Sequence, residues 1–109
     1  MSYDVCLTID TGGDGPAALD GTEQNYTYNC SPMFRAALGG KGLYELAGKP
    51  GGLAAQMLGH AIGQMVHHRE KYEAMNPENG WGDYSSAVKF LERLRADCLA
   101  HPKALVEVS

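Results

Sequence analysis

The chain has 109 residues, which is the size of one domain. Nine basic against thirteen acidic residues give a formal net charge of −4, whereas free-standing nucleic-acid-binding proteins carry a surplus of Lys and Arg. Hydrophobic residues make up 44% and charged residues 20% of the chain, as in globular and not in disordered proteins. No apolar run approaches the roughly 18 residues of a membrane span, and the N-terminus lacks the features of a signal peptide. We therefore expect a single soluble domain over residues 1–109, located in the cytoplasm, that binds neither membrane nor nucleic acid.

Cysteines and charges are unevenly placed. Cys6, Cys30 and Cys98 are widely spaced and form no C-x-x-C pair, so we expect three reduced, partly buried thiols and no zinc or disulfide framework. Residues 1–30 carry five acids and no Lys or Arg, whereas residues 31–71 carry five bases and two acids. The middle third is therefore where an anionic ligand would be favoured. The alternative is that the two stretches neutralise one another across the fold.

The first predicted element is a strand over Tyr3–Ile9, where apolar and polar residues alternate. Asp10–Gly21 is rich in Gly and contains Pro, which predicts a loop. Asn25–Asn29 contains alternating Tyr and Thr, which favour β-structure, and predicts a second strand. Ser31 is placed to cap a short helix over Pro32–Leu38, because Pro suits the first helical position.

The longest predicted helix covers Leu53–His68, where apolar residues at three- and four-residue spacing form a broad stripe. Ala55, Gly59 and Gly63 recur every fourth residue on this helix. Each Gly in a helix interior costs about 1 kcal/mol relative to Ala. We therefore expect close backbone contact between this row and another helix, in the same chain or in a second copy.

The remaining segments complete an α+β pattern. Glu70–Met75 predicts an irregular turn, and Asn76–Tyr84 predicts a loop that holds the only tryptophan. Asp83 is a candidate N-cap for a helix over Tyr84–Ala100, and Lys103–Val108 alternates as a final strand. The order ββαααβ predicts a small two- or three-stranded sheet packed on about three helices. Exposed edges of so small a sheet favour pairing between subunits.

Residues suited to catalysis or metal binding lack the spacing that these functions need. His60 and His67 would lie two turns apart on one helix face, whereas metal-binding histidines on a helix are typically four residues apart. Asp10–Gly15 lacks the lysine of a phosphate-binding P-loop and is no dinucleotide fingerprint. Its D-T-G triplet lacks the apolar surroundings of an aspartic-protease loop. We therefore expect no catalytic residue, no metal and no cofactor.

Two segments that combine aromatic and amide side chains predict a ligand site. Flat apolar faces beside hydrogen-bonding groups suit a small planar ligand such as a nucleobase. Helix starts near Ser31, Gly51 and Asp83 would add backbone N–H groups for phosphate. The candidate ligand-binding residues are Tyr26, Tyr28, Asn29, Arg35 (the counter-charge), Asn79, Trp81 and Tyr84. The alternative is that the tyrosines are strand residues and that Trp81 fixes its turn to the core.

Several motifs resemble those of a known group of proteins. They are LTIDTGG (Leu7–Gly13), NYTYNCSPMF (Asn25–Phe34), NPENGWGDY (Asn76–Tyr84) and the ending HPKALVEVS. Together, over nearly the whole chain, they resemble a functionally uncharacterised family of small proteins from tailed phages of actinobacteria. This resemblance implies a phage factor that acts in the host cytoplasm, and it assigns no functional residue.

Three functions follow as expectations. The first is a homo-oligomeric, non-catalytic counter-defence protein, similar to a viral sponge, that sequesters a nucleotide-like signalling molecule. The second is a factor that binds a host protein through the acidic N-terminal third of the chain. The third is a small enzyme, which would need a cluster of acid, base or metal ligands that the spacing does not predict.

Overall fold

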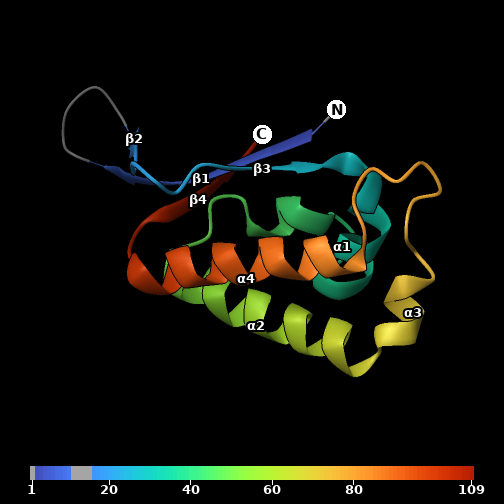
Figure 1. Ribbon diagram of the computed structural model, residues 1–109. Helices are drawn as coiled ribbons and strands as arrows, with labels where there is room; N and C mark the ends of the chain where they lie inside the picture. The colour runs from blue at the N-terminus through green and yellow to red at the C-terminus, as the bar shows by residue number, and fades with distance from the viewer. Residues whose placement is uncertain (1, 11–15) are drawn as a thin grey trace.

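The computed structural model describes residues 2–10 and 16–109. In Figure 1 a β-sheet forms one layer and helices cover one of its faces. The strands are β1 (Ser2–Asp10), β2 (Pro16–Ala18), β3 (Gln24–Thr27) and β4 (Leu105–Val108). The helices are α1 (Ser31–Leu38), α2 (Gly51–His67), α3 (Arg69–Glu73) and α4 (Tyr84–Ala100), with 3-10 turns η1 (Tyr28–Cys30) and η2 (Gly42–Leu46). The predicted α+β class is confirmed.

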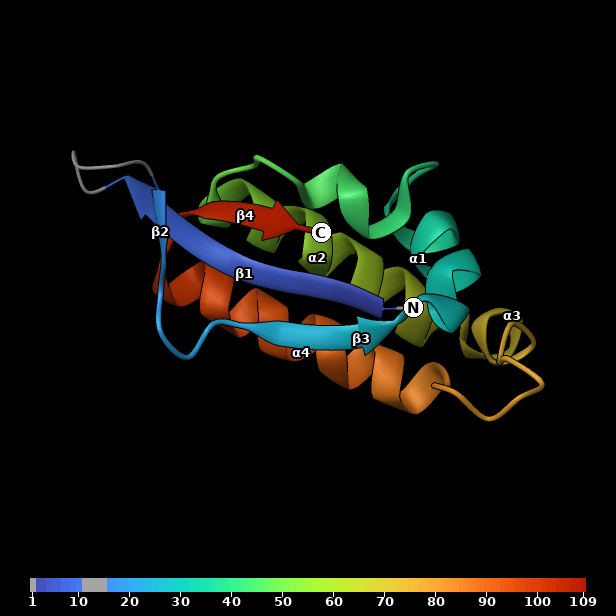
Figure 2. The same ribbon diagram turned by 90° about the horizontal axis from the view of Figure 1, so that it is seen from above.

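Strand β1 is the centre of the sheet and pairs antiparallel with each of the other three strands. Val5 pairs with Gln24 of β3 and also with Val108 of β4, so these two strands flank β1, as Figure 2 shows. The sheet has four strands where the sequence predicted two or three. Strand β2 lies inside the predicted Asp10–Gly21 loop. Its sequence, Pro-Ala-Ala, has low β-propensity, and it forms a strand because it pairs with the edge of β1. Residues 11–15 of that loop lie outside the described residues.

The core lies between the sheet and the helices. Alternate residues of β1 point into it: Tyr3, Val5 and Leu7 are at most 4% exposed. Their partners on the helices include Leu58, Met65, Phe90, Leu91 and Leu94, which are fully buried. The opposite face of the sheet has no helix over it (Figure 1) and carries polar residues such as the exposed Asp4 and Glu107. Among the described residues, no helix is long and apolar enough to cross a membrane.

The element bounds confirm the local signals and correct several details. Helix α4 begins and ends where predicted, and Asp83 caps it by accepting from the Ser86 N–H at 2.7 Å. Ser31 is not a cap but the first residue of α1; its Oγ donates to the Tyr28 carbonyl at 2.6 Å. The predicted strand over Asn25–Asn29 ends at Thr27, where η1 begins. The predicted turn at Glu70–Met75 contains the short helix α3.

The glycines of α2 differ in what surrounds them. A Cβ on Gly51 would lie 2.4 Å from the His101 carbonyl oxygen, so the start of α2 packs directly on the backbone that follows α4. A Cβ on Gly59 would lie 3.2 Å from Nε of Arg95, a flexible side chain of α4. A Cβ on Gly63 would have no neighbour within 4 Å among the described residues. Within this chain Gly59 therefore meets a side chain of α4 and not its backbone, and contact of Gly63 with a second copy stays a prediction.

Candidate functional site

An open hollow of about 530 Å³ lies where the loop before α4 meets β3 and the N-terminal end of β1. It is lined by Ser2, Asn25, Thr27, Asn29, Asn79 and Trp81. Three of the seven predicted ligand-binding residues, Asn29, Asn79 and Trp81, meet there although fifty positions separate the first two in the chain. A hollow lined by amides, hydroxyls and one indole suits a small ligand with both a flat face and hydrogen-bonding edges.

The indole of Trp81 is 68% exposed. The alternative that Trp81 fixes its turn to the core is therefore wrong, because such a residue would be buried. The backbone around it is held: the Trp81 N–H donates to Asn79 Oδ1 at 3.0 Å. On the other side, a Cβ on Gly82 would lie 2.7 Å from Cγ2 of Thr27, so the loop is in contact with β3. Trp81 is thus an exposed aromatic surface on a loop that is held by the Asn79 side chain and by the contact of Gly82 with β3.

The amide side chains around the hollow are held by hydrogen bonds. Asn25 Nδ2 donates to Asp4 Oδ1 at 2.8 Å and to Ser2 Oγ at 2.9 Å. Asn29 Nδ2 donates to Thr27 Oγ1 at 2.8 Å. Within residues 2–10 and 16–109, no hydrogen bond uses the indole N–H of Trp81 or Oδ1 of Asn25. One donor and one acceptor are therefore free to bind a ligand.

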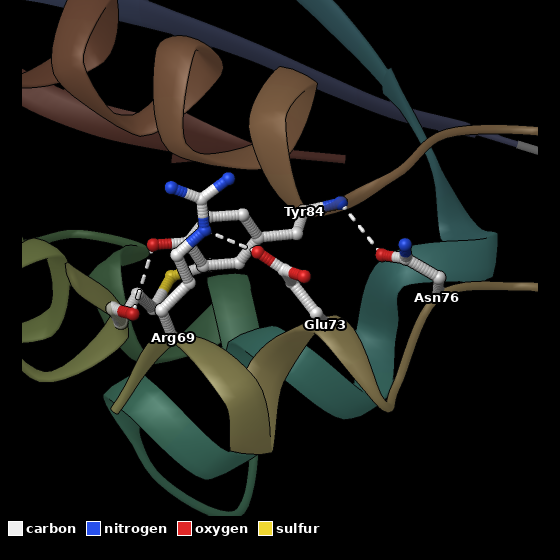
Figure 3. Close-up of polar contacts among 5 residues, drawn as sticks. Arg69, Glu73, Asn76 and Tyr84 are labelled. Carbon is white, nitrogen blue, oxygen red and sulfur yellow. Dashed lines mark hydrogen bonds and ion pairs between the residues drawn. The ribbon is translucent and has the colours of Figure 1, made fainter. Parts of the chain in front are cut away.

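Tyr26 and Tyr84 contribute to packing and do not line the hollow. The Tyr26 ring stacks on Phe90 with centroids 4.9 Å apart, and its hydroxyl lies 2.7 Å from Ser86 Oγ. Burial raises the pKa of Tyr26. Figure 3 shows Tyr84, which is 8% exposed and donates its hydroxyl to the Met65 carbonyl at 3.0 Å. Both tyrosines attach the start of α4 to other elements.

Tyr28 and Arg35 also lie outside the residues that line the hollow. The Tyr28 ring packs edge-on against Tyr3, with centroids 4.4 Å apart, and its hydroxyl lies 3.1 Å from that of Tyr44. Arg35 is exposed on α1. Among the described residues, the lining of the hollow contains no basic side chain, so the counter-charge that Arg35 was expected to supply is not next to Trp81.

The helix starts offer less to an anion than the sequence suggested. The first N–H groups of α2 are used within the chain, since Gly51 donates to the Ala104 carbonyl at 2.7 Å and Gly52 to that of Pro102 at 2.9 Å. At α4 the carboxylate of Asp83 occupies the N-terminus, and the hydrogen bonds from Ser86 lower the pKa of Asp83. A second anion at α4 would therefore meet an existing negative charge.

The other candidate groups are dispersed. No group of three or more His, Cys, Asp or Glu residues is placed to hold a metal ion in the part of the chain that the structure describes. His60, His67 and His68 are exposed. Burial is the largest cause of raised pKa values at Cys6, Cys30 and Cys98, which keeps these thiols protonated and weakly nucleophilic at neutral pH.

Comparison with known proteins gives no relative from which a function could be transferred. No protein-family model, no curated protein and no solved structure matches the chain. The resemblance to actinobacterial phage proteins therefore stays a prediction.

Sequence reasoning missed Ser2, Asn25 and Thr27 as lining residues. Their signal is the alternation of the strands, because Asn25 and Thr27 share a face on which Tyr26 does not lie. Ser2 joins them through the register, since it pairs with Thr27 across the sheet. The alternation could have been read from the sequence, whereas the register depends on tertiary structure.

Proposed function

We propose that this protein is a non-catalytic binding protein for a nucleotide-like molecule, whose base stacks on Trp81 in the hollow beside β3. The observation that carries the proposal is the 68% exposed indole, held beside three asparagine side chains. Stacking of a base on an aromatic side chain contributes about 1–3 kcal/mol. The Trp81 N–H and Asn25 Oδ1 offer a donor and an acceptor for the edge of the base.

The absence of basic residues in the lining decides which part of the ligand is recognised. With no Lys or Arg lining the hollow, a phosphate would gain little there and would point to solvent. We therefore expect nucleosides and nucleotides with the same base to bind with similar affinity. This expectation differs from the prediction made from the sequence, in which Arg35 was the counter-charge for the phosphate of the ligand.

The homo-oligomer remains a prediction that the energetics support. One stacking contact of about 1–3 kcal/mol is far below the roughly 8 kcal/mol that a micromolar dissociation constant requires. The hollow is open, so tight sequestration needs a second surface over the ligand. A second protomer could supply it, and the counter-defence role stays a prediction with it.

The test uses the fact that Trp81 is the only tryptophan. We expect adenosine, guanosine, ADP-ribose or a cyclic dinucleotide to quench the intrinsic fluorescence of the wild-type protein. Calorimetry should then show a loss of binding in Trp81→Ala of about fivefold or more, the equivalent of about 1 kcal/mol. Leu99→Ala is the matched control, since Leu99 is another exposed apolar side chain, 53% exposed, on α4. Full binding by Trp81→Ala would contradict the proposal, and so would a ligand that is recovered chemically altered.

A second candidate function, binding of a host protein through the acidic N-terminal third, is favoured by the acidic side chains Asp4 and Glu23, which line hollows beside the outer strand β3.

A further inference from the structure

The outer edge of β3 is free to pair with another strand. The Asp4 N–H donates to the Ser109 carbonyl at 2.9 Å, and the Ser109 N–H donates to the Asp4 carbonyl at 2.8 Å. The backbone groups of Asp4 therefore point toward β4. In an antiparallel sheet the backbone N–H and carbonyl groups of successive residues point toward opposite neighbouring strands. Those of Tyr3 and Val5 therefore point toward β3. Their partners Tyr26 and Gln24 point back toward β1, which turns the backbone of Asn25 and the N–H of Thr27 away from the sheet.

No hydrogen bond within residues 2–10 and 16–109 uses the N–H or carbonyl of Asn25 or the N–H of Thr27. In Figure 2 β3 lies at the outside of the sheet, above α4. Natural proteins protect such edges with Lys, Pro, a bulge or a very short strand. β3, QNYT, is short at four residues, but it contains neither Lys nor Pro.

Acidic side chains surround this edge. A hollow of about 350 Å³ on the open face of the sheet is lined by Asp4, Glu23, Asn25 and Glu107 among others. A second hollow, of about 480 Å³, lies between β3 and α4 and is lined by Glu23, Gln24, Asn25, Asp97 and Arg93 together with Gly21 and Ala96. Four acids thus accompany one base. Within the described residues the only ion pair is Arg69–Glu73, so these acids are not neutralised by partners.

A buried acceptor lies at the same place. Gln24 Nε2 donates to Asp97 Oδ2 at 2.9 Å, while Gln24 Oε1 is buried and has no hydrogen-bond partner among the described residues. A buried carbonyl without a donor is unfavourable by about 1–3 kcal/mol. A Lys or Arg side chain entering between β3 and α4 could donate both to this oxygen and to Asp97.

We propose that the outer edge of β3 binds an extended, basic segment of another protein as an added strand. The segment's backbone pairs with Asn25 and Thr27, and its Lys or Arg side chains face Glu23 on the open side and Asp97 on the helix side. Pairing of this edge with a second copy of the chain is disfavoured, because the acidic side chains of the two copies would repel one another. This binding mode goes beyond nucleotide binding and does not depend on Trp81.

The probe is a fluorescently labelled, end-blocked peptide that repeats Lys-Lys-Val-Val, so that adjacent Lys side chains point to opposite faces of the added strand. A peptide that repeats Glu-Glu-Val-Val is the charge control. We expect the full-length protein to bind only the Lys peptide, and more weakly as salt rises from about 0.05 M to about 0.5 M. Glu23→Gln and Asp97→Asn should each weaken binding by about two- to fivefold. Equal binding of the Glu peptide would overturn the proposal.

Two variants of Thr27 separate edge pairing from charge attraction. Thr27 has φ −67°, which Pro adopts, and its N–H points away from β1, so Thr27→Pro removes an edge donor without breaking the sheet. We expect Thr27→Pro to weaken peptide binding at least about tenfold. Thr27→Val loses the same hydroxyl but keeps the N–H, and it should bind within about twofold of the wild type.

Hydrogen exchange on the wild-type protein gives a test that needs no variant. Adding the Lys peptide should slow exchange at the N–H groups of Asn25 and Thr27. Exchange at the N–H groups of Gln24 and Tyr26, which already pair with β1, should not change. Unchanged exchange at Asn25 and Thr27 would overturn the proposal. So would protection of these two groups by rising protein concentration alone, since that would place a second copy on the edge.

Discussion

Gly82 packs so closely on Thr27 that a Cβ at position 82 would lie 2.7 Å from Thr27 Cγ2. The same Cβ would lie 2.9 Å from Cys30 Sγ. Gly82 also has φ +89°, a backbone conformation in which a side chain is strained. This one residue therefore sets where the loop of Trp81 meets β3.

We expect Gly82→Ala to lower the free energy of unfolding by about 2–4 kcal/mol, because strain and overpacking add. Gly80→Ala is the matched control: Gly80 has φ +75°, but no described atom lies within 4 Å of the added Cβ, so about 1–2 kcal/mol should be lost. Urea unfolding measures both. Equal losses in the two variants would show that contact with Thr27 does not hold the loop.

The Tyr84 hydroxyl should matter for stability more than that of Tyr28. Tyr84→Phe leaves the buried Met65 carbonyl without this donor, so the free energy of unfolding should fall by about 1–3 kcal/mol. Tyr28→Phe removes a hydrogen bond between exposed hydroxyls and should change it by about 0.5 kcal/mol or less. Thermal unfolding of both variants measures the difference, and a larger loss in Tyr28→Phe would contradict it.

Glycines of α2 should respond to alanine in opposite directions. In Gly51→Ala the new Cβ would lie 2.4 Å and 2.8 Å from two backbone carbonyl oxygens, of His101 and Cys98. Since backbone cannot move aside cheaply, we expect a loss of about 2 kcal/mol or more in the free energy of unfolding. Gly63→Ala meets no described atom within 4 Å and should gain about 0.5–1 kcal/mol from helix propensity. Destabilisation by Gly63→Ala in dilute solution would contradict this and would indicate a close neighbour, such as a second copy.

Stability should decrease at alkaline pH because of Cys98. Burial, with a smaller contribution from Asp97, raises the pKa of the Cys98 thiol from 9.0 to about 11. Between these values the unfolded chain loses the proton and the folded chain keeps it, so the free energy of unfolding is unaffected below about pH 9 and falls as pH rises toward 11. Burial also raises the pKa of Tyr26 and Cys30, which adds to this fall.

Cys98→Ala should therefore flatten the pH dependence without abolishing it. Urea unfolding at about pH 8 and about pH 10 gives the slope of the free energy of unfolding against pH for each protein. An identical slope in Cys98→Ala and the wild type would mean that this thiol ionises equally in both states.

Local signals predicted the three longer helices, although the observed α2 begins at Gly51 and not at the predicted Leu53, and they missed the short helix α3. Helix α4 runs over Tyr84–Ala100 as expected, because a side-chain cap at Asp83 and a 3.6-residue apolar period act within a few residues of one another. The first strand was likewise visible in its alternation. Strand β2 was not, since it forms only where Thr8 and Ile9 of β1 lie beside Ala18 and Ala17.

The candidate residues could be chosen from the sequence by their chemistry, whereas their positions depended on the fold. Asn29, Asn79 and the exposed Trp81 line one hollow, so the two polar segments meet there, and their role in binding stays a prediction. The roles of Tyr26 and Tyr84 depend on Phe90 and Met65, which are distant in the chain. A tyrosine in a polar segment has the same local pattern whether its ring faces a ligand or the core.

What could be read from the sequence of residues 1–109 was therefore composition, the three longer helices and the chemistry of the loops, all set by neighbours within about a turn or a strand. The register of β3, the free edge at Asn25 and the different surroundings of Gly51 and Gly63 came from the tertiary structure alone. The reason is physical: hydrogen-bond direction and packing at these positions depend on which distant segment lies alongside, and a local period carries no information about that segment.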